Sequence, residues 1–279
     1  MARFHPPFGD DFRANIAVTG KENWQANMKD WLGLMIGNSR LHWGLFRDNR
    51  LAKTWNTFQA ESLAELNTVV EDEELKECLR AQIPLYFASV VPSATKMYLS
   101  LPQARIIDCS LIPLKNTYPS LGCDRILTLW GGGCKYGFPC LVIDSGTALT
   151  FSGADAQRRF RGGAILPGVK LQLQALFFHT ASLPEVEIMA DLTPRWATNT
   201  PCAIQSGVIY TITAGIRDFA EDWLKQYPCS KVIFTGGDAL LLSHYFRRIY
   251  PDFQADIVVD PNLIFLGMWE YVSLLDSPF

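Results

Sequence analysis

Short apolar runs separated by polar residues and glycine follow one another from residue 31 onward and predict three consecutive strands. Runs of four to eight apolar, β-branched or aromatic residues bounded by turn residues are typical of buried strands. The pattern therefore predicts strands at residues 32–36, 41–46 and 51–58. Residues 1–30 show no sustained period. We expect them to form an N-terminal extension that adds no element to the core.

Helices and strands are predicted to alternate over the rest of the first half. Helical spacing with an acidic early part covers residues 62–82, and a second helix is expected after Pro92. Proline is tolerated in the first turn of a helix because the N–H that it lacks has no partner there. In chain order the predicted elements are a helix at 62–82, a strand at 85–90, a helix at 93–101, a strand at 104–108 and a helix at 124–134.

The same order of elements returns in the second half of the chain. Three strands are predicted at residues 140–143, 148–153 and 160–165. They are followed by helices at 167–179 and 200–226, a strand at 231–235, a helix at 240–249, a strand at 256–259 and a closing helix at 261–275. Three strands followed by alternating helices and strands thus occur twice. This alternation favours an α/β protein with two mixed sheets covered by helices.

Composition narrows the class of protein. The length of 279 residues fits about two domains of ~150 residues, with one large domain as the alternative. The hydrophobic share of 48% provides a sizeable core, which argues against a disordered chain. The net charge of -3 argues against the broad basic surface that duplex nucleic acid requires. The charge-free stretch at residues 196–216 carries several polar side chains and is expected to be a buried helix, not a membrane span.

Cysteine usage and the N-terminus suggest the compartment. The seven cysteines are Cys78, Cys109, Cys123, Cys134, Cys140, Cys202 and Cys229. Their number is odd and no two form Cys-x-x-Cys, so reduced thiols are favoured over a disulfide framework or a zinc site. The polar and charged first 30 residues do not have the pattern of a secretory signal. We therefore expect a cytoplasmic protein.

The stretch Asp144-Ser145-Gly146-Thr147 is the first candidate for chemistry. A predicted strand ends at Asp144, glycine permits close approach of backbone to a ligand, and the two hydroxyl residues can bind phosphate oxygens. The carboxylate can hold a cation that neutralises phosphate charge. An ordinary hairpin turn uses the same residues. A second strand–turn–strand copy at Gly37-Asn38-Ser39 favours a paired phosphate site.

The stretch Gly122-Cys123-Asp124-Arg125 lies at the start of a predicted helix. Its simplest reading is a helix cap followed by a surface cation. In the functional reading, Asp124 accepts a proton from an attacking hydroxyl, and Arg125 clamps an anionic group of the substrate or of the transferring phosphate.

Two glycine-rich stretches and one threonine complete the set of candidates. In each of two stretches, a pair of glycines precedes the start of a predicted helix: residues 161–168 and Thr235-Gly236-Gly237-Asp238. They suit a phosphate or nucleotide lying against bare backbone, although glycine pairs also mark simple bends. Neither matches the P-loop pattern. Thr200, after Asn199, stands at the start of a long helix, where it either takes part in capping or contacts a substrate.

In this order, the motifs resemble those of type III pantothenate kinases, the family that includes the Bvg accessory factor homologues. The resemblance extends over about residues 32–275 and rests on six stretches. They are Ile36-Gly37-Asn38-Ser39, Gly122-Cys123-Asp124-Arg125, residues 144–150, residues 162–168, residues 199–207 and Thr235-Gly236-Gly237. Each stretch alone is weak, and it is their order along the chain that makes the resemblance specific.

The resemblance implies two duplicated ribonuclease-H-like domains of the acetate and sugar kinase/Hsp70/actin type, with ATP in a cleft between them. We expect the first domain at residues 31–138, with a C-terminal helix at 261–279 packing back on it, and the second at 139–260. The implied reaction is phosphorylation of pantothenate by ATP to 4'-phosphopantothenate, the first step of coenzyme A synthesis. The resemblance also implies a magnesium-like divalent ion, a monovalent cation (potassium or ammonium) and a homodimer.

Roles for individual residues follow from the same resemblance. Asp124 matches the proton acceptor, Asp144 the ligand of the monovalent cation and Thr147 an ATP contact. The first turn and its flanks are expected to bind ATP through Met35, Ile36, Gly37, Asn38, Ser39, Arg40, Leu41 and His42. The expected pantothenate contacts are Tyr118, Gly122, Cys123, Asp124, Arg125 and Thr200.

The chain departs from the family pattern at two positions. Met35 stands where the family has an aspartate, and a thioether cannot replace a carboxylate beside a hard cation. Tyr118 matches a substrate-binding tyrosine, but it lies closer to the Gly-x-Asp-Arg stretch than usual. Two alternatives stay open: a kinase of the same fold that acts on another small hydroxyl compound, and a catalytically silent or weak binding protein, which the change at Met35 keeps open.

Overall fold

The computed structural model describes residues 30–188 and 191–276 of the chain. The predicted N-terminal extension lies outside the described residues, apart from Asp30. The chain folds as two compact units. The described part of unit 1 comprises residues 30–112, 117–126 and 268–276, and that of unit 2 comprises residues 113–116, 127–188 and 191–267. The domain limits at residues 31–138 and 139–260 stay a prediction.

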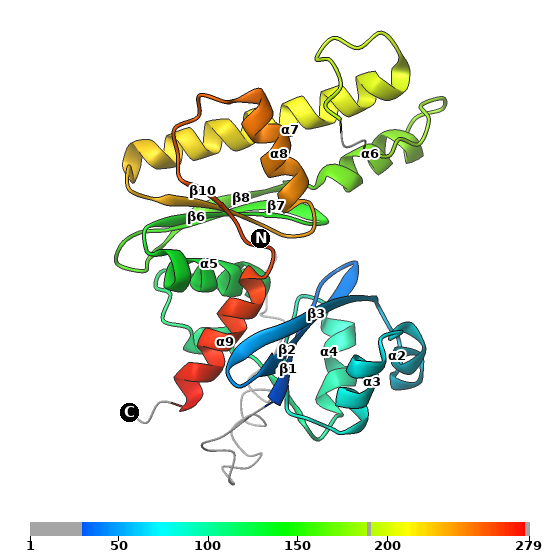
Figure 1. The fold of residues 1–279 in the computed structure, drawn as a ribbon, viewed down its shortest axis with the longest axis vertical. Helices are drawn as coiled ribbons and strands as arrows, with labels where there is room; N and C mark the ends of the chain where they lie inside the picture. The colour runs from blue at the N-terminus through cyan, green and yellow to red at the C-terminus, as the bar shows by residue number, and fades with distance from the viewer. Residues whose placement is uncertain (1–29, 189–190, 277–279) are drawn as a thin grey trace, which may run out of the picture. The chain divides into compact units, whose positions relative to one another are not determined.

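A five-stranded mixed sheet forms the centre of unit 1 (Figure 1). Its strands are β1 (Asp30–Ile36), β2 (Arg40–Arg47), β3 (Arg50–Phe58), β4 (Leu85–Ser89) and β5 (Ala104–Ile106). They lie in the order β3-β2-β1-β4-β5. The first three pair antiparallel, whereas β4 runs parallel to β1 and β5 parallel to β4. The predicted hairpin strands and the two later strands are confirmed.

Three helices cover one face of this sheet. They are α2 (Leu63–Val69), α3 (Glu73–Arg80) and α4 (Pro92–Leu99), and a 3₁₀ turn η1 (Cys109–Leu111) follows β5. Leu34 of β1 is fully buried in the same core cluster as Leu75 of α3 and Tyr98 of α4. Neighbouring residues of a strand point to opposite faces. Accordingly, Trp31 and Gly33 lie on the other face, where Gly33 has Met268 close by and Trp31 stacks on Phe46 at 3.8 Å.

The single helix predicted at residues 62–82 is wrong, because the chain forms two helices there. Val70 ends α2 in an extended conformation, and Asp72 begins α3 as its N-cap. The Asp72 carboxylate accepts hydrogen bonds from the backbone of Glu74 and Leu75, and it also accepts one from Lys53 of β3. A cap bond of this kind satisfies N–H groups that a helix start leaves without partners.

Unit 2 repeats the sheet of unit 1. Its strands are β6 (Cys140–Ser145), β7 (Ala148–Ala154), β8 (Phe160–Pro167), β9 (Lys231–Thr235) and β10 (Ile257–Val259). They lie in the order β8-β7-β6-β9-β10, which matches β3-β2-β1-β4-β5 strand for strand. Again the first three pair antiparallel and the last two run parallel to them. The predicted duplication of two mixed α/β sheets is confirmed.

Helices cover both faces of the second sheet. They are α6 (Val169–Phe178), α7 (Thr200–Gln226) and α8 (Ala239–Ile249), together with parts of α5 (Cys123–Tyr136) and α9 (Leu263–Asp276). Ile143 and Phe234 belong to the core cluster that includes residues of α6, α7 and α8. These three helices lie on the same side of the sheet (Figure 1). On the opposite face, Gly132 of α5 lies against Val142 and Ile233. A side chain there would collide with the sheet.

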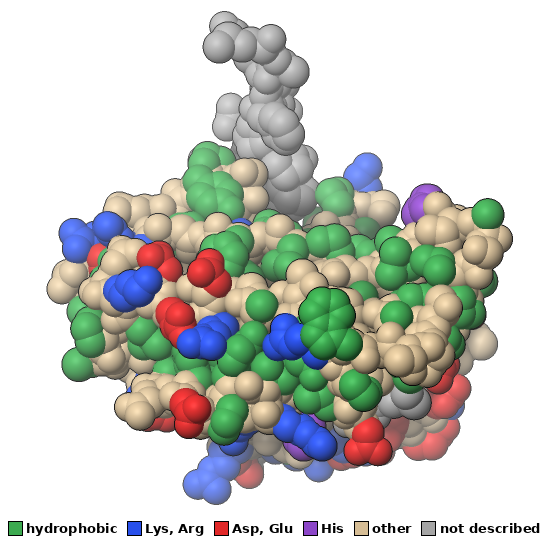
Figure 2. Space-filling view, turned by 90° about the horizontal axis from the view of Figure 1, so that it is seen from above, with side chains coloured by type: hydrophobic (Ala, Val, Ile, Leu, Met, Phe, Trp, Pro, Cys, Tyr) green, Lys and Arg blue, Asp and Glu red, His purple; other side chains and the backbone are tan. Residues whose placement is uncertain are grey.

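The bounds of α7 agree with the prediction, but those of α6 do not. The helix predicted at residues 167–179 begins only at Val169, because Pro167 ends β8 and Gly168 is the N-cap. None of the helices in the described ranges 30–188 and 191–276 is long and apolar enough to cross a membrane. On the face shown in Figure 2, the described acidic and basic side chains are interspersed with hydrophobic ones and form no continuous basic area. This distribution agrees with the net charge of -3.

Candidate active site

The first phosphate-binding candidate is the turn between β1 and β2. Gly37 follows β1, its N–H donates to Arg40 O at 3.1 Å, and Asn38 and Ser39 are exposed. Gln59, just after β3, donates from its side-chain amide to Gly37 O. Gln59 was not among the predicted site residues, because only the pairing of β3 with β2 brings it to the turn. The exposed residues at the tip suit a ligand that approaches from solvent.

His42 and Met35 flank this turn on paired strands. The His42 ring contacts Asn56 Oδ1 through Nδ1 at 2.5 Å, and burial lowers the pKa of His42. A neutral ring with its Nδ1 proton donated to Asn56 has Nε2 as an acceptor only. The Met35 side chain is 4% exposed. The departure from the family aspartate therefore places a buried apolar side chain near the end of β1.

The Gly122-Cys123-Asp124-Arg125 stretch lies near the same edge of the first sheet. Val90 follows β4, and its N–H donates to Ile36 O at the end of β1 at 3.1 Å. A Cβ on Gly122 would lie 3.9 Å from the Val90 side chain and 2.3 Å from Asp124 Oδ1. The ends of β1 and β4 thus bring the Gly37 turn and the start of α5 to one edge of the sheet. These are two of the motifs that the sequence singled out.

Asp124 occupies the first turn of α5. Its Oδ1 accepts a hydrogen bond from the backbone N–H of Arg125 at 2.8 Å. Burial nevertheless raises the pKa of Asp124, because removing the charged carboxylate from water outweighs the hydrogen bonds to backbone N–H groups and the nearby Arg125 charge. A desolvated carboxylate with a raised pKa is a stronger base than an ordinary one, which suits a proton acceptor.

Arg125 and Tyr118 are in direct contact. Arg125 is buried to 6% exposure, and its Nη1 donates to the Tyr118 hydroxyl at 3.0 Å. Tyr118 itself is 43% exposed. The short connection between them places the tyrosine beside the guanidinium group. A guanidinium group binds anions through charge-assisted hydrogen bonds, so Arg125 is a candidate anion-binding group.

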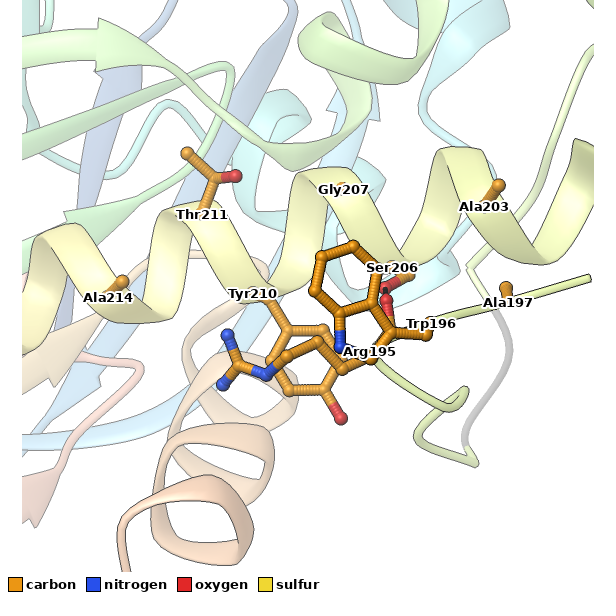
Figure 3. Close-up of a pocket in the computed structure, with 9 residues that line it drawn as sticks. All are labelled: Arg195, Trp196, Ala197, Ala203, Ser206, Gly207, Tyr210, Thr211 and Ala214. Atoms are coloured by element: carbon orange, nitrogen blue, oxygen red, sulfur yellow. Dashed lines mark hydrogen bonds between the residues drawn. The ribbon is translucent and has the colours of Figure 1, made fainter.

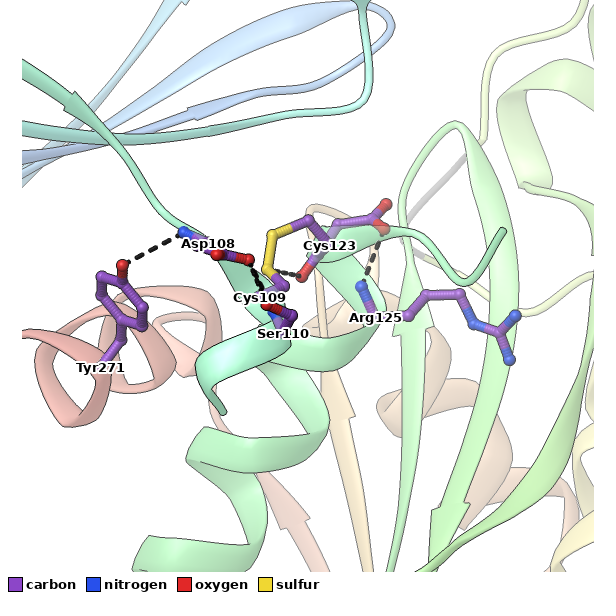
Figure 4. The surroundings of a disulfide bond; sticks show 7 residues. Asp108, Cys109, Ser110, Cys123, Arg125 and Tyr271 are labelled. Atoms are coloured by element: carbon purple, nitrogen blue, oxygen red, sulfur yellow. Dashed lines mark hydrogen bonds between the residues drawn. A yellow bond between two sulfur atoms is a disulfide. The ribbon is translucent and has the colours of Figure 1, made fainter. Parts of the chain in front are cut away.

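The prediction that the cysteines stay reduced is wrong for one pair. Cys123, the first residue of α5, forms a disulfide with Cys109 of η1 (Figure 4). Their Cα atoms are 6.0 Å apart, within the range that a disulfide spans. The two cysteines are 14 positions apart and share no recognisable spacing motif. Only the return of the chain from β5 to α5 places them together.

The second phosphate-binding candidate, the turn between β6 and β7, is packed between two glycines. Gly168 donates its N–H to Thr147 O at 2.9 Å, and a Cβ there would lie 2.1 Å from Gly146 O. Gly236, after β9, has a φ of 90°, and a Cβ there would lie 2.4 Å from Asp144 Oδ1. Both contacts are closer than a Cβ permits. The glycines of the predicted stretches are therefore required by close packing around this turn.

Strand pairing shows that Asp144 and Met35 hold equivalent places. Each lies two residues before the glycine of its turn, on the strand that pairs with both a hairpin partner and a parallel strand. Asp144 is partly exposed, whereas Met35 is buried. Within the described ranges, no three His, Cys, Asp or Glu residues gather into a metal-binding group. A carboxylate is thus present in only one of the two equivalent turns.

The predicted site residues fall into two sets in different units. Residues 35–42, Tyr118 and residues 122–125 belong to unit 1, where the structure brings the Gly37 turn and the start of α5 to one edge of the sheet. Asp144, Thr147 and Thr200 belong to unit 2. Thr200 is exposed at the start of α7, and Asn199 supplies the cap bond to Cys202 N at 3.0 Å. The cap is therefore made by Asn199, not by the Thr200 hydroxyl.

A surface hollow of about 520 Å³ lies along α7 and contains none of the predicted site residues (Figure 3). Trp196 at its rim is 89% exposed, and the Arg195 guanidinium lies 4.2 Å from the centre of the Tyr210 ring. Ser206 of α7 donates to Arg195 O at 2.7 Å and holds this segment against the helix. The hollow offers an aromatic surface and no catalytic group.

Solved structures share the fold. A candidate Baf family transcriptional activator from Campylobacter jejuni superposes with a TM-score of 0.59 at 21% identity, covering 88% of this chain and 98% of its own. A candidate 2-dehydro-3-deoxygalactonokinase from Sinorhizobium meliloti superposes with a TM-score of 0.55 at 11% identity, covering 89% and 98%. At such identities the likeness shows the fold alone. The predicted α/β fold of the sugar kinase and actin type is confirmed.

Proteins related by sequence share a much higher identity with this chain than these solved structures do. The type III pantothenate kinase of Nostoc sp. strain PCC 7120 is 49% identical over 261 residues, which cover 87% of this chain and 94% of the relative. That of Synechocystis sp. strain PCC 6803 is 42% identical over 242 residues, covering 86% and 89%. The sequence profile of type III pantothenate kinases matches residues 31–222. This chain belongs to the type III pantothenate kinase family.

Proposed function

We propose that this protein transfers the γ-phosphoryl group of ATP to the primary hydroxyl of pantothenate, forming 4'-phosphopantothenate and ADP in the first step of coenzyme A synthesis. Family membership at 49% identity to the Nostoc kinase supports the reaction. The structural observation that supports this reaction most directly is the desolvated Asp124 carboxylate in the first turn of α5, next to the buried Arg125. This pair combines a base with an anion-binding group.

Asp124 is the proton acceptor in the proposed reaction. The pantothenate hydroxyl oxygen bonds to the γ-phosphorus, the bond from that phosphorus to the bridging oxygen breaks to release ADP, and the hydroxyl proton moves to the Asp124 carboxylate. Phosphoryl transfer proceeds through a loose transition state, so a base must above all be well positioned. The hydrogen bond from Arg125 N to Asp124 Oδ1 holds the carboxylate in the first turn of α5.

Pantothenate and the transferring phosphate carry negative charge, and Arg125 is the group that binds an anion in this proposal. Its contact with Tyr118 orients the guanidinium plane, which favours a bidentate contact. Gly122, without a side chain, leaves room for the Asp124 carboxylate, because a Cβ there would lie 2.3 Å from Oδ1. Cys123 and Thr200 are further proposed contacts, carried over from the family motif.

ATP is proposed to contact residues 35–42 and Thr147 through backbone N–H groups and hydroxyls. When bound, a divalent ion such as magnesium neutralises charge on the phosphates. No group of three potential metal ligands occurs in the described part of the chain, which suits an ion bound mainly by phosphates and water. With Met35 buried and apolar, the first turn supplies no carboxylate for it.

A monovalent cation, potassium or ammonium, is proposed to bind at Asp144. The donor set fits, because the Asp144 carboxylate and Ser145 O both face the position of the absent Gly236 side chain, at 2.4 Å and 2.5 Å from a Cβ placed there. Large monovalent ions are bound by backbone carbonyls in proteins. A carboxylate oxygen and a backbone carbonyl oxygen thus lie together beside Gly236.

The protein is further proposed to be a cytoplasmic homodimer. The reaction draws on the cytoplasmic pool of ATP, which supports the compartment. Trp196 at 89% exposure and the aromatic hollow along α7 support a protein contact, since large exposed apolar groups often mark interfaces. Light scattering coupled to size exclusion tests this: a mass of twice 31.3 kDa is expected, and a mass of one chain at micromolar concentration would contradict it.

Coupled ADP release tests the reaction itself. Purified protein is assayed with ATP, magnesium and potassium, with and without pantothenate, and the product is identified by mass spectrometry. Pantothenate-dependent ADP together with a product heavier by one phosphate is expected. ADP release that does not depend on pantothenate, or none at all, would defeat the proposal.

A further inference from the structure

The Cys109–Cys123 disulfide joins η1 to the start of α5, the helix that carries the proposed base (Figure 4). Asp108 Oδ1 accepts hydrogen bonds from Ser110 N at 3.0 Å and from Ser110 Oγ at 2.6 Å, and the Asp108 N–H donates to the Tyr271 hydroxyl at 3.1 Å. All these residues belong to unit 1. The cross-link therefore joins α5 to a turn that is itself hydrogen-bonded on two sides.

The residue tied by this bond is next to the proposed base. Cys123 directly precedes Asp124, and both lie between Gly122 and the buried Arg125. The preceding backbone lacks a side chain at Gly122, where a Cβ would collide with Asp124 Oδ1 at 2.3 Å. A glycine backbone has more conformational freedom than any other. The disulfide compensates for this freedom by holding the segment at its next residue.

We propose that Cys109 and Cys123 form a reversible redox site, and that the disulfide form holds Gly122, Asp124 and Arg125 ready to bind pantothenate whereas the dithiol form binds it more weakly. The effect on pantothenate rests on the proposed function; the redox site does not. Ordering a binding segment in advance lowers the cost of binding, so the disulfide form has the lower KM for pantothenate.

The redox step is a thiol–disulfide exchange. A dithiol, either a small molecule or a protein of the Cys-x-x-Cys class, gives two electrons and two protons. The Cys109–Cys123 S–S bond breaks, two thiols form, and the reductant becomes a disulfide. The reverse reaction uses a low-molecular-weight disulfide such as oxidised glutathione, which is reduced to two thiols. Disulfides in cytoplasmic proteins are usually transient and often redox-sensing, which fits the proposed compartment.

The surroundings make this pair the selective target. Both cysteines are partly exposed, so an exchange partner can reach the sulfur atoms. Cys78 and Cys140 are buried, and burial raises the pKa of both thiols, that of Cys140 to about 12. A thiol with so high a pKa is unreactive near neutral pH. Cys134 and Cys229 are exposed and Cys202 is partly exposed, but none of these three is in a disulfide.

Labelling of the full chain tests the redox site without any activity. Protein treated with oxidised glutathione is alkylated, then reduced with dithiothreitol, alkylated with a second reagent and mapped by mass spectrometry. Cys109 and Cys123 are expected to carry the second label, and Cys134 and Cys229 the first. First label on Cys109 and Cys123 after oxidation would overturn the proposal. Amide hydrogen exchange is expected to be slower at residues 118–126 in the oxidised form.

Kinetics test the consequence for pantothenate. Reduction of the wild type is expected to raise the KM for pantothenate by about two- to tenfold, the cost of ordering a mobile side chain, and to leave the KM for ATP unchanged. Cys109→Ser should match the reduced wild type in both redox conditions. Cys134→Ser, on the same helix, should keep the full redox response. Equal KM values for pantothenate in the two wild-type forms would overturn the proposal.

The two proposals can fail separately. If neither redox form turns over pantothenate, the proposed function is wrong. The labelling still decides whether the pair is a redox site, and the amide exchange rates still decide whether the disulfide orders residues 118–126. Equal exchange rates in the two forms would then overturn the positioning role. Because the wild type is compared with itself after chemical reduction, the result does not depend on the folding of Cys109→Ser.

Discussion

The Arg125 guanidinium donates from Nη1 to the Tyr118 hydroxyl at 3.0 Å and joins the loop before α5 to the first turn of that helix. Arg125 is almost completely buried, whereas Tyr118 is 43% exposed. The tyrosine thus connects a buried cation with the surface. The preceding residue, Asp124, has a carboxylate of raised pKa. These three side chains lie close together around the start of α5 and form one part of the candidate site.

Asp124→Asn is expected to lower pantothenate turnover by roughly 10²–10⁴-fold, the range typical of acid–base groups. Burial raises the pKa of Asp124, so its ionised form costs stability above that pKa, and the neutral amide removes this cost. The melting temperature at pH 7 should therefore stay the same or rise. Calorimetry and coupled ADP release measure both quantities. The control is Asp218→Asn, at an exposed position on α7. If Asp124→Asn turns over pantothenate about as fast as this control, Asp124 is not part of the mechanism.

The pH profile should report the same carboxylate. A base must be ionised to accept a proton, and a raised pKa means that protonation begins at a higher pH than for an ordinary aspartate, whose pKa is about 3.9. The acid limb of kcat/KM for pantothenate is thus expected to have its midpoint above that value. Steady-state rates in overlapping buffers measure the midpoint. A limb at or below the ordinary value would contradict the desolvation of Asp124.

Met35→Asp should not raise activity tenfold at saturating magnesium. The position is 4% exposed, so the new carboxylate would be buried. A buried polar group without partners costs about 1–3 kcal/mol, and the melting temperature is expected to fall. Met35→Leu, which conserves volume, is the control and should change stability by less than about 1.5 kcal/mol. A tenfold gain in turnover by Met35→Asp would show that the methionine impairs the site.

Gly168→Ala is expected to lower kcat/KM for ATP by roughly 10- to 100-fold, because small displacements in an active site have effects of that order. The φ of Gly168 is -67° and suits alanine, but the new Cβ would lie 2.1 Å from Gly146 O and push on the second turn. Gly215→Ala in α7, where no atom lies within 4 Å, is the matched control. If both variants keep wild-type kinetics for ATP, the turn at Gly146 does not bind the nucleotide.

Replacing potassium with sodium is expected to lower turnover, and Asp144→Asn to raise the potassium concentration for half-maximal activity by at least about tenfold. Loss of partners even outside the first ligand shell costs 10- to 100-fold in metal affinity. The control is Asp238→Asn, since it keeps the backbone N–H that donates to Ser145 O at 2.9 Å. Identical potassium dependence in Asp144→Asn and wild type would place the cation elsewhere.

Local signals were sufficient for most of the elements. The apolar runs predicted ten strands at nearly the observed positions, since a buried strand needs only a short run of apolar side chains between turn residues. The bounds of α7 at Thr200 and Gln226 were also evident, because Asn199 is a strong capping residue. The motif order along the chain was enough to identify the family and with it the candidate residues.

Tertiary contacts decided what the local pattern left open. The break between α2 and α3 follows from Asp72, which caps α3 and bonds to Lys53 on a strand 19 residues earlier. The contact of Gln59 with Gly37 depends on β3 lying next to β2. Neither partner can be inferred from its neighbours in sequence, because each depends on which surfaces meet once the sheet has formed.

For this protein, the sequence by itself determined the duplicated order of elements, the family and the chemical types in the site, because periodicity and motif order are local properties of the chain. The tertiary structure decided that Cys109 meets Cys123, that Met35 is buried where Asp144 is partly exposed, and that Gly168 and Gly236 are required by close packing. These features depend on distances between segments remote in sequence, which only the folded backbone defines.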